Sequence, residues 1–485
     1  GNPPTTQAAD QTPATDVLQT PVKRSLKNGY EPQLATSWDI SPDGKTFTFK
    51  LRKNVTFHDG TPFNAEAMAF SLNRFIQNGG RPAFLLDEKV EAIAATGEYE
   101  LTITLKAPFA AFPSLLTFWG MSAVSPAAYT IAAGSFEPNS FVGTGPYQLT
   151  ELSSDIVRLD ANPDYWGGAP ANDVLDIQLI SSSANLFNIF RTGGVDVAYQ
   201  TLDPDQIEAV KAGAAENNWQ VIEAGGTAIA YLTMNQKQEP LDQLPVRQAI
   251  AAMIDRELLT ERVFKGQVEP LYSLLPTSFD SYDPVFKAAY GDGDYDNAKA
   301  LLAEAGIDAS NPLELEFWYP AASTERQLVS TTLKAAIEQN LPGIVNVTVS
   351  SDEGSKIFGD LDKGIYPTVL LNWYGDFFDA DTYFQPFLDC TEGDAAGGCV
   401  TGATQANGSF YYSDRANELI AAQRAESDPA ARQQIFQALQ ALLVEDVPYV
   451  PLWQVKDFIF AQGDIDGVAI QPTQQFLFWQ MSKGS

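Results

Sequence analysis

Side chains that commonly carry catalysis or hold metal ions are scarce in this sequence. Among its 485 residues there is one histidine, His58, and there are two cysteines, Cys390 and Cys399. A single histidine excludes every site that needs two, including the HExxH zinc site. No serine lies in a GxSxG motif, and Gly143 and Gly145 lack the neighbours of a phosphate-binding loop. We therefore expect no catalytic residue, no cofactor and no metal site.

The two cysteines are separated by the short segment TEGDAAGG, which is small, polar and rich in glycine. Structural zinc takes four ligands, and two thiols in a chain with one histidine are a poor set for it. The short, flexible segment can close on itself, so the sequence predicts a disulfide between Cys390 and Cys399. Such a bond indicates an oxidising compartment outside the cytosol.

Charge excludes a further class of partner. Thirty Lys and Arg residues stand against 61 Asp and Glu residues, which gives a formal net charge of −31. Binding to phosphate backbones needs clustered basic residues, so nucleic acid is not an expected partner.

The uncharged stretch from Ala107 to Phe136 is interrupted by several prolines and by Gly120. A membrane-spanning helix needs about 20 mostly apolar residues without such breaks, so we expect a buried strand and loop there.

Residues 1–15 are polar and rich in proline, threonine, glutamine and alanine. A segment of this composition does not bury enough apolar surface to fold, and we expect a disordered tether. Exported bacterial lipoproteins often begin in this way just after a lipidated cysteine. A lipid anchor is therefore one hypothesis for this end of the chain, and an unmodified tail is the alternative.

The rest of the chain mixes strand and helix patterns. Alternating polar and apolar residues predict half-buried strands at 45–51 and 99–105, and a strand buried on both faces is expected at 364–373. Helices are predicted after the N-cap residue Asn64, from Pro245 to Leu258 as one apolar stripe, and at 298–305 before Gly306. Residues 413–445 predict two helices separated at 427–429. This mixture, with no internal repeat, indicates an α/β protein of several lobes.

Several motifs together resemble the family 5 extracellular solute-binding proteins of bacterial ABC importers, which bind dipeptides, oligopeptides or nickel. They occur in the family's order and cover nearly the whole chain. The motifs are EPQLATSWDISPDGKTFTFKLRKNVTFHDGTPFNAEA from Glu31, VGTGPYQL from Val142, NPDYWGG from Asn162, PVRQAIAAMIDRELL from Pro245, YDNAKALLAEAG from Tyr295, NWYGDFFDADTYF from Asn372 and VPYVPLW from Val447. Each alone is weak, and the ordered set is specific.

The resemblance implies a two-lobed periplasmic-binding-protein fold, type II-like, with an inserted small domain and three domains in all. We expect residues 16–28, 169–269 and 456–485 to form domain I, 29–168 the small domain II and 270–455 domain III. One departure concerns the opening strand, Leu-Asp-Pro segment and helix of the family. Only residues 16–28 stand in their place, so ligand contacts from that region are not assigned.

The resemblance also implies the ligand-binding residues. The family places an aspartate directly after the buried cleft strand, where it binds the ligand's α-ammonium, and Asp376 matches that position, with Asp379 and Asp381 as alternatives. The other expected ligand-binding residues are Trp373, Tyr374, Gly375, Trp119, Gly120, Met121, Trp318, Gly226 and Thr227. The aromatic residues have the core as their alternative, and Gly225–Thr227 have an ordinary turn. No basic residue stands out as the partner of a peptide's carboxylate, and His58 is expected to be structural.

The implied function is that of an extracytoplasmic, monomeric binding protein. It would capture a short peptide between two lobes that close about a hinge, and deliver it to the membrane permease of an ABC importer. One alternative keeps the fold and changes the ligand to an opine, an oligosaccharide or a metal chelate. A remote alternative is a secreted hydrolase with carboxylates as acid and base.

Overall fold

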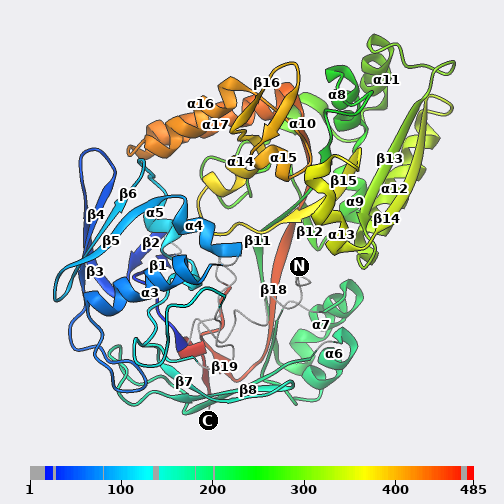
Figure 1. Ribbon diagram of the computed structural model, residues 1–485. Coiled ribbons are helices and arrows are strands. Elements are labelled where there is room, and N and C mark those ends of the chain that lie inside the picture. Colours follow the sequence, from blue (N-terminus) through cyan, green and yellow to red (C-terminus); the bar gives the residue numbers. More distant parts are fainter. Residues whose placement is uncertain are drawn as a thin grey trace. The chain divides into compact units, whose positions relative to one another are not determined.

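The computed structural model describes residues 17–25, 29–79, 81–134, 141–180, 182–199, 202–470 and 478–484 (Figure 1). The predicted tether at 1–15 lies outside these residues. Helices and strands are mixed along the chain, as the sequence predicts. Within the residues described, none of the helices is both long and apolar enough to span a bilayer.

The chain divides into two compact units. Unit 1 comprises Gly225–Gly375 and Asp379–Lys456, and unit 2 comprises the described residues up to Ala224, Asp376–Phe378 and the described residues from Asp457. The division falls inside two long neighbouring strands, β11 (Trp219–Met234) and β18 (Tyr449–Gln462). Each of these strands contributes one part to each unit. The finer division into three domains remains a prediction.

Unit 1 is built on a sheet with the strand order β18-β11-β15-β13-β14. β15 (Thr368–Trp373) pairs antiparallel with β11 and parallel with β13 (Leu313–Pro320), which pairs parallel with β14 (Val345–Asp352). The short β12 (Val268–Pro270) pairs with β18. The first four residues of β15 are buried in this mixed sheet, in which β15 lies between β11 and β13. The strand expected at 364–373 is thus confirmed in its second part.

Helices surround this sheet, and Figure 1 shows α16 and α17 running side by side. The helices of unit 1 are α8 (Leu244–Met253), α9 (Arg256–Arg262), α10 (Val285–Tyr290), α11 (Tyr295–Glu304), α12 (Thr324–Asn340), α13 (Gly354–Asp360), α14 (Asp381–Leu388), α15 (Ala403–Ala406), α16 (Asp414–Ala425) and α17 (Pro429–Asp446). The helix expected at 298–305 and the pair expected at 413–445 are confirmed. α17 starts where the Asp428 side chain accepts a hydrogen bond from the Ala431 amide.

The single helix expected from Pro245 to Leu258 is wrong. α8 ends at Met253, Ile254 is extended, and Asp255 begins α9 by accepting a hydrogen bond from the Leu258 amide at 2.8 Å. The apolar stripe is continuous because both helices are buried on the same core. The boundary is set by the capping carboxylate, which satisfies an amide that has no partner within the helix.

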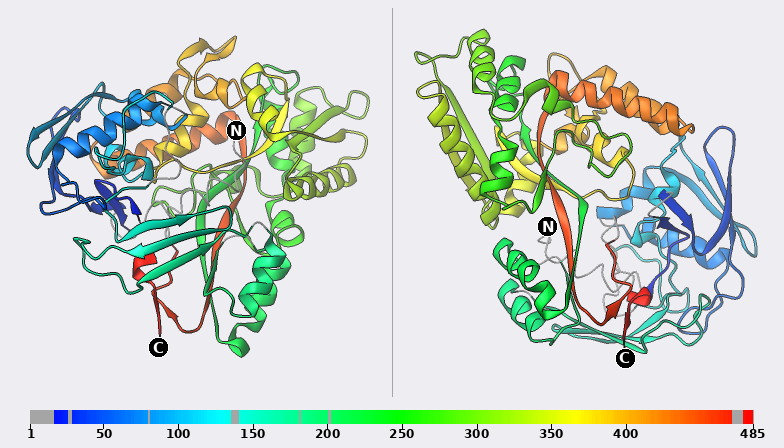
Figure 2. Two further views of the ribbon diagram at one scale, coloured as in Figure 1. Left: turned by 60° about the horizontal axis from the view of Figure 1, so that its bottom comes forward. Right: turned by 180° about the vertical axis from the view of Figure 1, so that it is seen from behind.

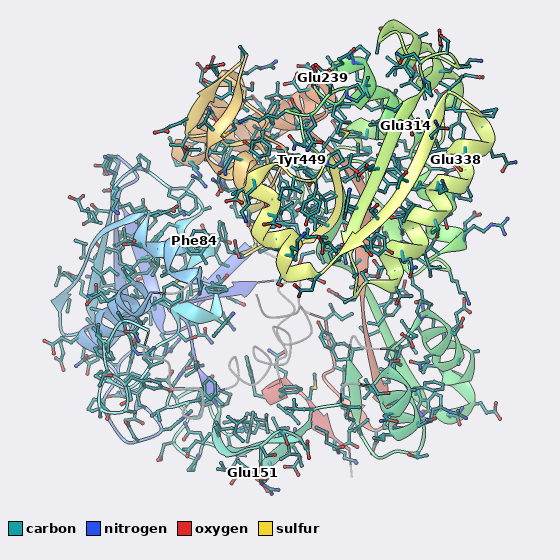
Figure 3. The ribbon with its side chains drawn as sticks, turned by 45° about the vertical axis from the view of Figure 1, so that its right-hand side comes forward. Phe84, Glu151, Glu239, Glu314, Glu338 and Tyr449 are labelled. Carbon is teal, nitrogen blue, oxygen red and sulfur yellow. A yellow bond between two sulfur atoms is a disulfide. The ribbon has the colours of Figure 1, made fainter. Side chains whose placement is uncertain are left out.

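Aromatic side chains fill the centre of unit 1. Tyr449, labelled in Figure 3, is fully buried and contacts Tyr231 and Phe387 edge to face. At the surface of this unit, β16 (Glu392–Asp394) and β17 (Gly398–Thr401) form an antiparallel hairpin. A disulfide joins Cys390 to Cys399 beside this hairpin, which confirms the predicted pairing.

Among its described residues, unit 2 contains two antiparallel sheets of three or more strands, two small two-stranded sheets and several helices. The first sheet has the order β3-β4-β6-β5, and the second, cyan to teal in Figure 2, has the order β7-β8-β9. Their strands are β3 (Ala35–Ile40), β4 (Thr46–Leu51), β5 (Val90–Gly97), β6 (Glu100–Leu105), β7 (Tyr147–Leu152), β8 (Ile156–Ala161) and β9 (Val174–Gln178). β4 and β6 confirm the two alternating strands expected from the sequence. Helix α3 (Ala65–Asn78) begins as predicted, because the Asn64 side chain accepts from the Ala67 amide.

Two local predictions in the chain are wrong. The stretch expected to be a buried strand and loop from 107 to 136 forms short helical turns in its described part, α5 (Phe112–Leu115) and η2 (Trp119–Met121). Pro113 lies in the first turn of α5, a position where the missing amide hydrogen does no harm. The turn expected at Gly225–Thr227 is instead the interior of β11. Glycine has no side chain to pack in a strand, but it can be fully extended.

Candidate functional site

The candidate site in unit 1 lies at the carboxyl edge of its parallel strands. β13 ends at Pro320 and β15 ends at Trp373, and both point toward the same edge because they are parallel. Ligands of open α/β sheets bind outside the carboxyl ends of the strands. The chain after β15 carries Tyr374, Gly375 and Asp376, which are three of the predicted ligand-binding residues.

The loop after β15 is closed by side chains at its base. The Trp373 indole Nε1 donates to the Thr382 carbonyl at 2.8 Å, and the Tyr383 hydroxyl donates to the Thr227 carbonyl at 2.7 Å. A side chain at Gly375 would place its Cβ 2.8 Å from the Tyr383 hydroxyl, so glycine is required there by close approach. The structure thus brings Trp373, Gly375 and Thr227 together around Tyr383.

The two alternative aspartates of the motif are engaged elsewhere in unit 1. Asp379 accepts two hydrogen bonds from Arg432 at 2.6 and 2.7 Å. Asp381 accepts two from Arg424 at 2.7 and 2.8 Å. Carboxylates held in such bidentate pairs have their charge neutralised and their lone pairs occupied. Neither is available for a ligand's ammonium, and this favours Asp376.

Asp376 belongs, with Phe377 and Phe378, to unit 2. Phe377 is buried in the core of that unit and meets Phe109 edge to face, and the Ser114 hydroxyl donates to the Phe378 carbonyl at 2.6 Å. Burial raises the pKa of Asp376 to about 6, and the positive charge of Lys89 acts in the opposite direction. A carboxylate with this environment gains from a cationic partner, because the partner stabilises the ionised form that burial disfavours.

Arg326 is a residue that the sequence analysis missed. It lies in the first turn of α12, directly after β13, and interacts electrostatically with Tyr374. Burial lowers the pKa of Arg326. Its Nε is buried and has no hydrogen-bond partner in the part of the chain that the structure describes. The start of α12 at its N-cap Ser323, three residues after the end of β13, is the local signal that could have located Arg326 at the strand edge.

The other predicted residues are distributed over both units. Trp318 is half-buried on β13, where its Nε1 donates to Glu316 at 2.7 Å and its ring meets Tyr366 edge to face. Gly226 lies within β11. Trp119, in unit 2, follows α5 and not the strand expected before it, and its buried Nε1 has no partner among the described residues.

Gly120 and Met121, which follow Trp119, are closely packed within unit 2. A side chain at Gly120 would place its Cβ 2.6 Å from the Phe75 ring, so the position requires glycine. The Met121 side chain is fully buried in the core of unit 2, which leaves only its backbone for a ligand. The three residues 119–121 thus offer one indole and backbone groups.

His58 is bound to the backbone of unit 2. Its Nε2 lies 3.0 Å from the Gly145 carbonyl, and the Gly143 amide donates to its Nδ1 at 3.4 Å. The carbonyl accepts only, so Nε2 carries the proton and Nδ1 is the acceptor. Burial lowers the pKa of His58. Both ring nitrogens are therefore occupied by backbone partners. Within the described residues, no group of three His, Cys, Asp or Glu side chains is arranged to hold a metal ion.

The family model of the bacterial extracellular solute-binding proteins, family 5, middle region, matches residues 29–395. The chain belongs to this family. Relatives of the family 5 chain include the probable D,D-dipeptide-binding periplasmic protein DdpA of Escherichia coli strain K12, with 28% identity over 463 residues that cover 92% of this chain and 84% of that protein. The di/tripeptide-binding protein 2 of Pseudomonas aeruginosa strain UCBPP-PA14 is also 28% identical, over 91% of this chain and 84% of that protein.

Solved structures confirm the two-lobed fold that family 5 implies. NikA from Brucella suis, in complex with Fe(III)-EDTA, matches with a TM-score of 0.84 and 21% identity, over 97% of this chain and 95% of that chain. DppA from Helicobacter pylori, in complex with the peptide STSA, matches with a TM-score of 0.76 and 23% identity, over 97% of this chain and 93% of that chain. These likenesses establish the fold.

Replacing Asp376 by Asn removes a carboxylate whose ionised form burial disfavours. The pKa rises from 3.8 to about 6 on folding, so ionisation lowers the stability of the folded protein as the pH rises through this window. We expect the free energy of unfolding of Asp376→Asn to exceed that of the wild type by about 1–3 kcal/mol above about pH 6. The difference should disappear below about pH 4. Denaturant unfolding across this range checks it, with the exposed Asp39→Asn as control. A difference that does not change with pH contradicts the assigned environment.

Proposed function

We propose that this chain is the extracytoplasmic binding protein of an ABC importer, that it binds a short peptide with a free α-ammonium group, and that it delivers the peptide to the membrane permease. It acts without chemistry on its ligand. The observation that carries the proposal is Asp376, a half-buried carboxylate within the loop after β15 whose pKa is raised by burial to about 6. Relatives support it, because their names describe binding of dipeptides, di- and tripeptides, and glutathione.

A peptide presents two constant groups, the α-ammonium and the α-carboxylate, whatever its side chains. Asp376 supplies the anionic partner for the first. We infer that Arg326 supplies the cationic partner for the second, since its Nε is buried without a hydrogen-bond partner among the described residues and the side chain interacts electrostatically with Tyr374 of the loop. A guanidinium binds a carboxylate through two parallel hydrogen bonds, which fixes orientation as well as charge.

Proteins of this fold also carry other ligands. Structures similar to this chain hold Fe(III)-EDTA in NikA and agropinic acid in the protein AgaA. A chelate or an opine does not offer the free N-terminal ammonium group that Asp376 would bind in a peptide. The binding measurements below therefore separate the peptide from these ligands. Lipid anchoring, a monomeric state and closure about a hinge remain predictions.

Asp376→Asn should weaken binding of short peptides with a free N-terminus by about 2 kcal/mol or more, because a charge-assisted bond in a desolvated site is lost. Binding of the same peptides with an acetylated N-terminus should be nearly unchanged. Isothermal titration calorimetry measures both, and Asp39→Asn, an exposed aspartate of unit 2, is the matched control. Equal losses for the two kinds of peptide would show that Asp376 does not bind the ammonium.

Arg326→Gln should weaken binding of peptides with a free C-terminus by about 1.5–3 kcal/mol, the range of hydrogen bonds to charged groups. Peptides with an amidated C-terminus should be affected much less. The control is Arg415→Gln, an arginine that is 57% exposed and forms only a surface pair with Glu445. If amidated peptides lose as much affinity as free acids, the carboxylate is not bound by Arg326.

A further inference from the structure

Two arginines bind the chain immediately after Asp376. Asp379 and Asp381 start the return of the chain into unit 1 and into α14, and their partners lie on α16 and α17 (Figure 1). Arg432 of α17 binds Asp379, and Arg424 of α16 binds Asp381. The two aspartates are also linked to each other, since the Asp381 amide donates to Asp379 Oδ1 at 2.9 Å.

Each nitrogen of the Arg432 guanidinium donates a hydrogen bond in this region. Nη1 and Nη2 donate to the two oxygens of Asp379, Nη2 also donates to Gln423 Oε1 at 2.8 Å, and Nε donates to the Gln423 carbonyl at 3.0 Å. Gln423, which is fully buried, donates through its Nε2 to Asp381. One amide side chain therefore joins the two ion pairs into a single network.

The network is largely withdrawn from water. The side chains of Arg432 and Asp379 are 15% and 13% exposed, and that of Asp381 is 3% exposed. For buried ion pairs the loss of hydration roughly offsets the attraction between the charges, so they contribute little net stability compared with apolar side chains. A bidentate pair does fix the relative orientation of its two side chains, because the planar guanidinium donates two parallel hydrogen bonds to the carboxylate.

The fixed orientation of these pairs restrains the short segment between Trp373 and Asp379. Trp373 is fixed on one side by its bond to the Thr382 carbonyl, and Asp379 is fixed on the other side by Arg432. Residues 374–378 connect these two fixed points and carry Asp376 in the middle. A binding group must be held to within about 0.5 Å of its productive position, and residues behind it usually supply that restraint.

We propose that Arg432 and Arg424 are positioning residues for ligand binding, which hold the 379–381 end of the 373–381 loop, opposite the end held at Trp373, so that Asp376 is presented in one place to the ligand's ammonium group. The inference rests on the proposed function. It assigns a role in recognition to residues that do not touch the ligand, and it explains why two buried charge pairs are placed directly behind the binding carboxylate.

The test is a double-mutant cycle between Arg432→Gln and Asp376→Asn, with Arg415→Gln as the control arginine. Arg432→Gln should weaken binding of free-amine peptides by about tenfold or more and leave N-acetylated peptides nearly unaffected, since only the ammonium contact depends on the loop. In the Asp376→Asn background the same substitution should cause no further loss. Additive losses, or equal losses for both kinds of peptide, would overturn the proposal.

Two further measurements keep the result decisive. Arg432→Lys retains the charge but not the fork, so it should not restore binding; full restoration would show that charge alone matters. Amide hydrogen exchange of residues 374–380 in the protein without ligand should be faster in Arg432→Gln, and unchanged exchange would overturn the proposal whatever the ligand is.

If Arg432→Gln does not fold, Arg424→Gln, at a 26% exposed position, takes its place. Wild-type protein that does not distinguish free-amine from acetylated peptides contradicts the proposed function, while hydrogen exchange still decides the role of the arginines.

Discussion

Two continuous strands connect the two compact units of this protein. β11 and β18 are neighbours in one sheet, and each passes from one compact unit into the other without a loop. The residues on either side of the division are therefore held by strand pairing, β18 with β10 (Val197–Tyr199) in unit 2 and β11 with β15 in unit 1. The loop that carries Asp376 follows β15, which pairs with β11.

The candidate site combines groups that do not favour stability by themselves. Burial raises the pKa of Asp376, and burial lowers the pKa of Arg326 although the charge of Glu325 acts in the opposite direction. Asp379 and Asp381 are each paired with an arginine within unit 1. In the proposed function, the same acidic motif contains one carboxylate for the ligand and two that hold the loop. This division of roles joins the fold to the function of a binding protein.

Much of the fold followed from local sequence patterns, because alternation and capping act within a few residues. The strands around Phe47 and Leu101 and the start of α3 at Asn64 were predictable for this reason. The disulfide followed from the spacing of two cysteines. The break at Ile254 was hidden because an apolar stripe reports burial and not backbone continuity. The roles of Asp379 and Asp381 depend on arginines far away in the sequence, which no local pattern reveals.

The most direct measurement of the central claim is native mass spectrometry of the purified protein, followed by denaturation and identification of the small molecules that it releases. The account predicts a mixed population of short peptides with free termini, present in wild-type protein and reduced in Asp376→Asn. A single non-peptide species, such as a metal chelate or an opine, would contradict peptide binding while leaving the family and the fold in place.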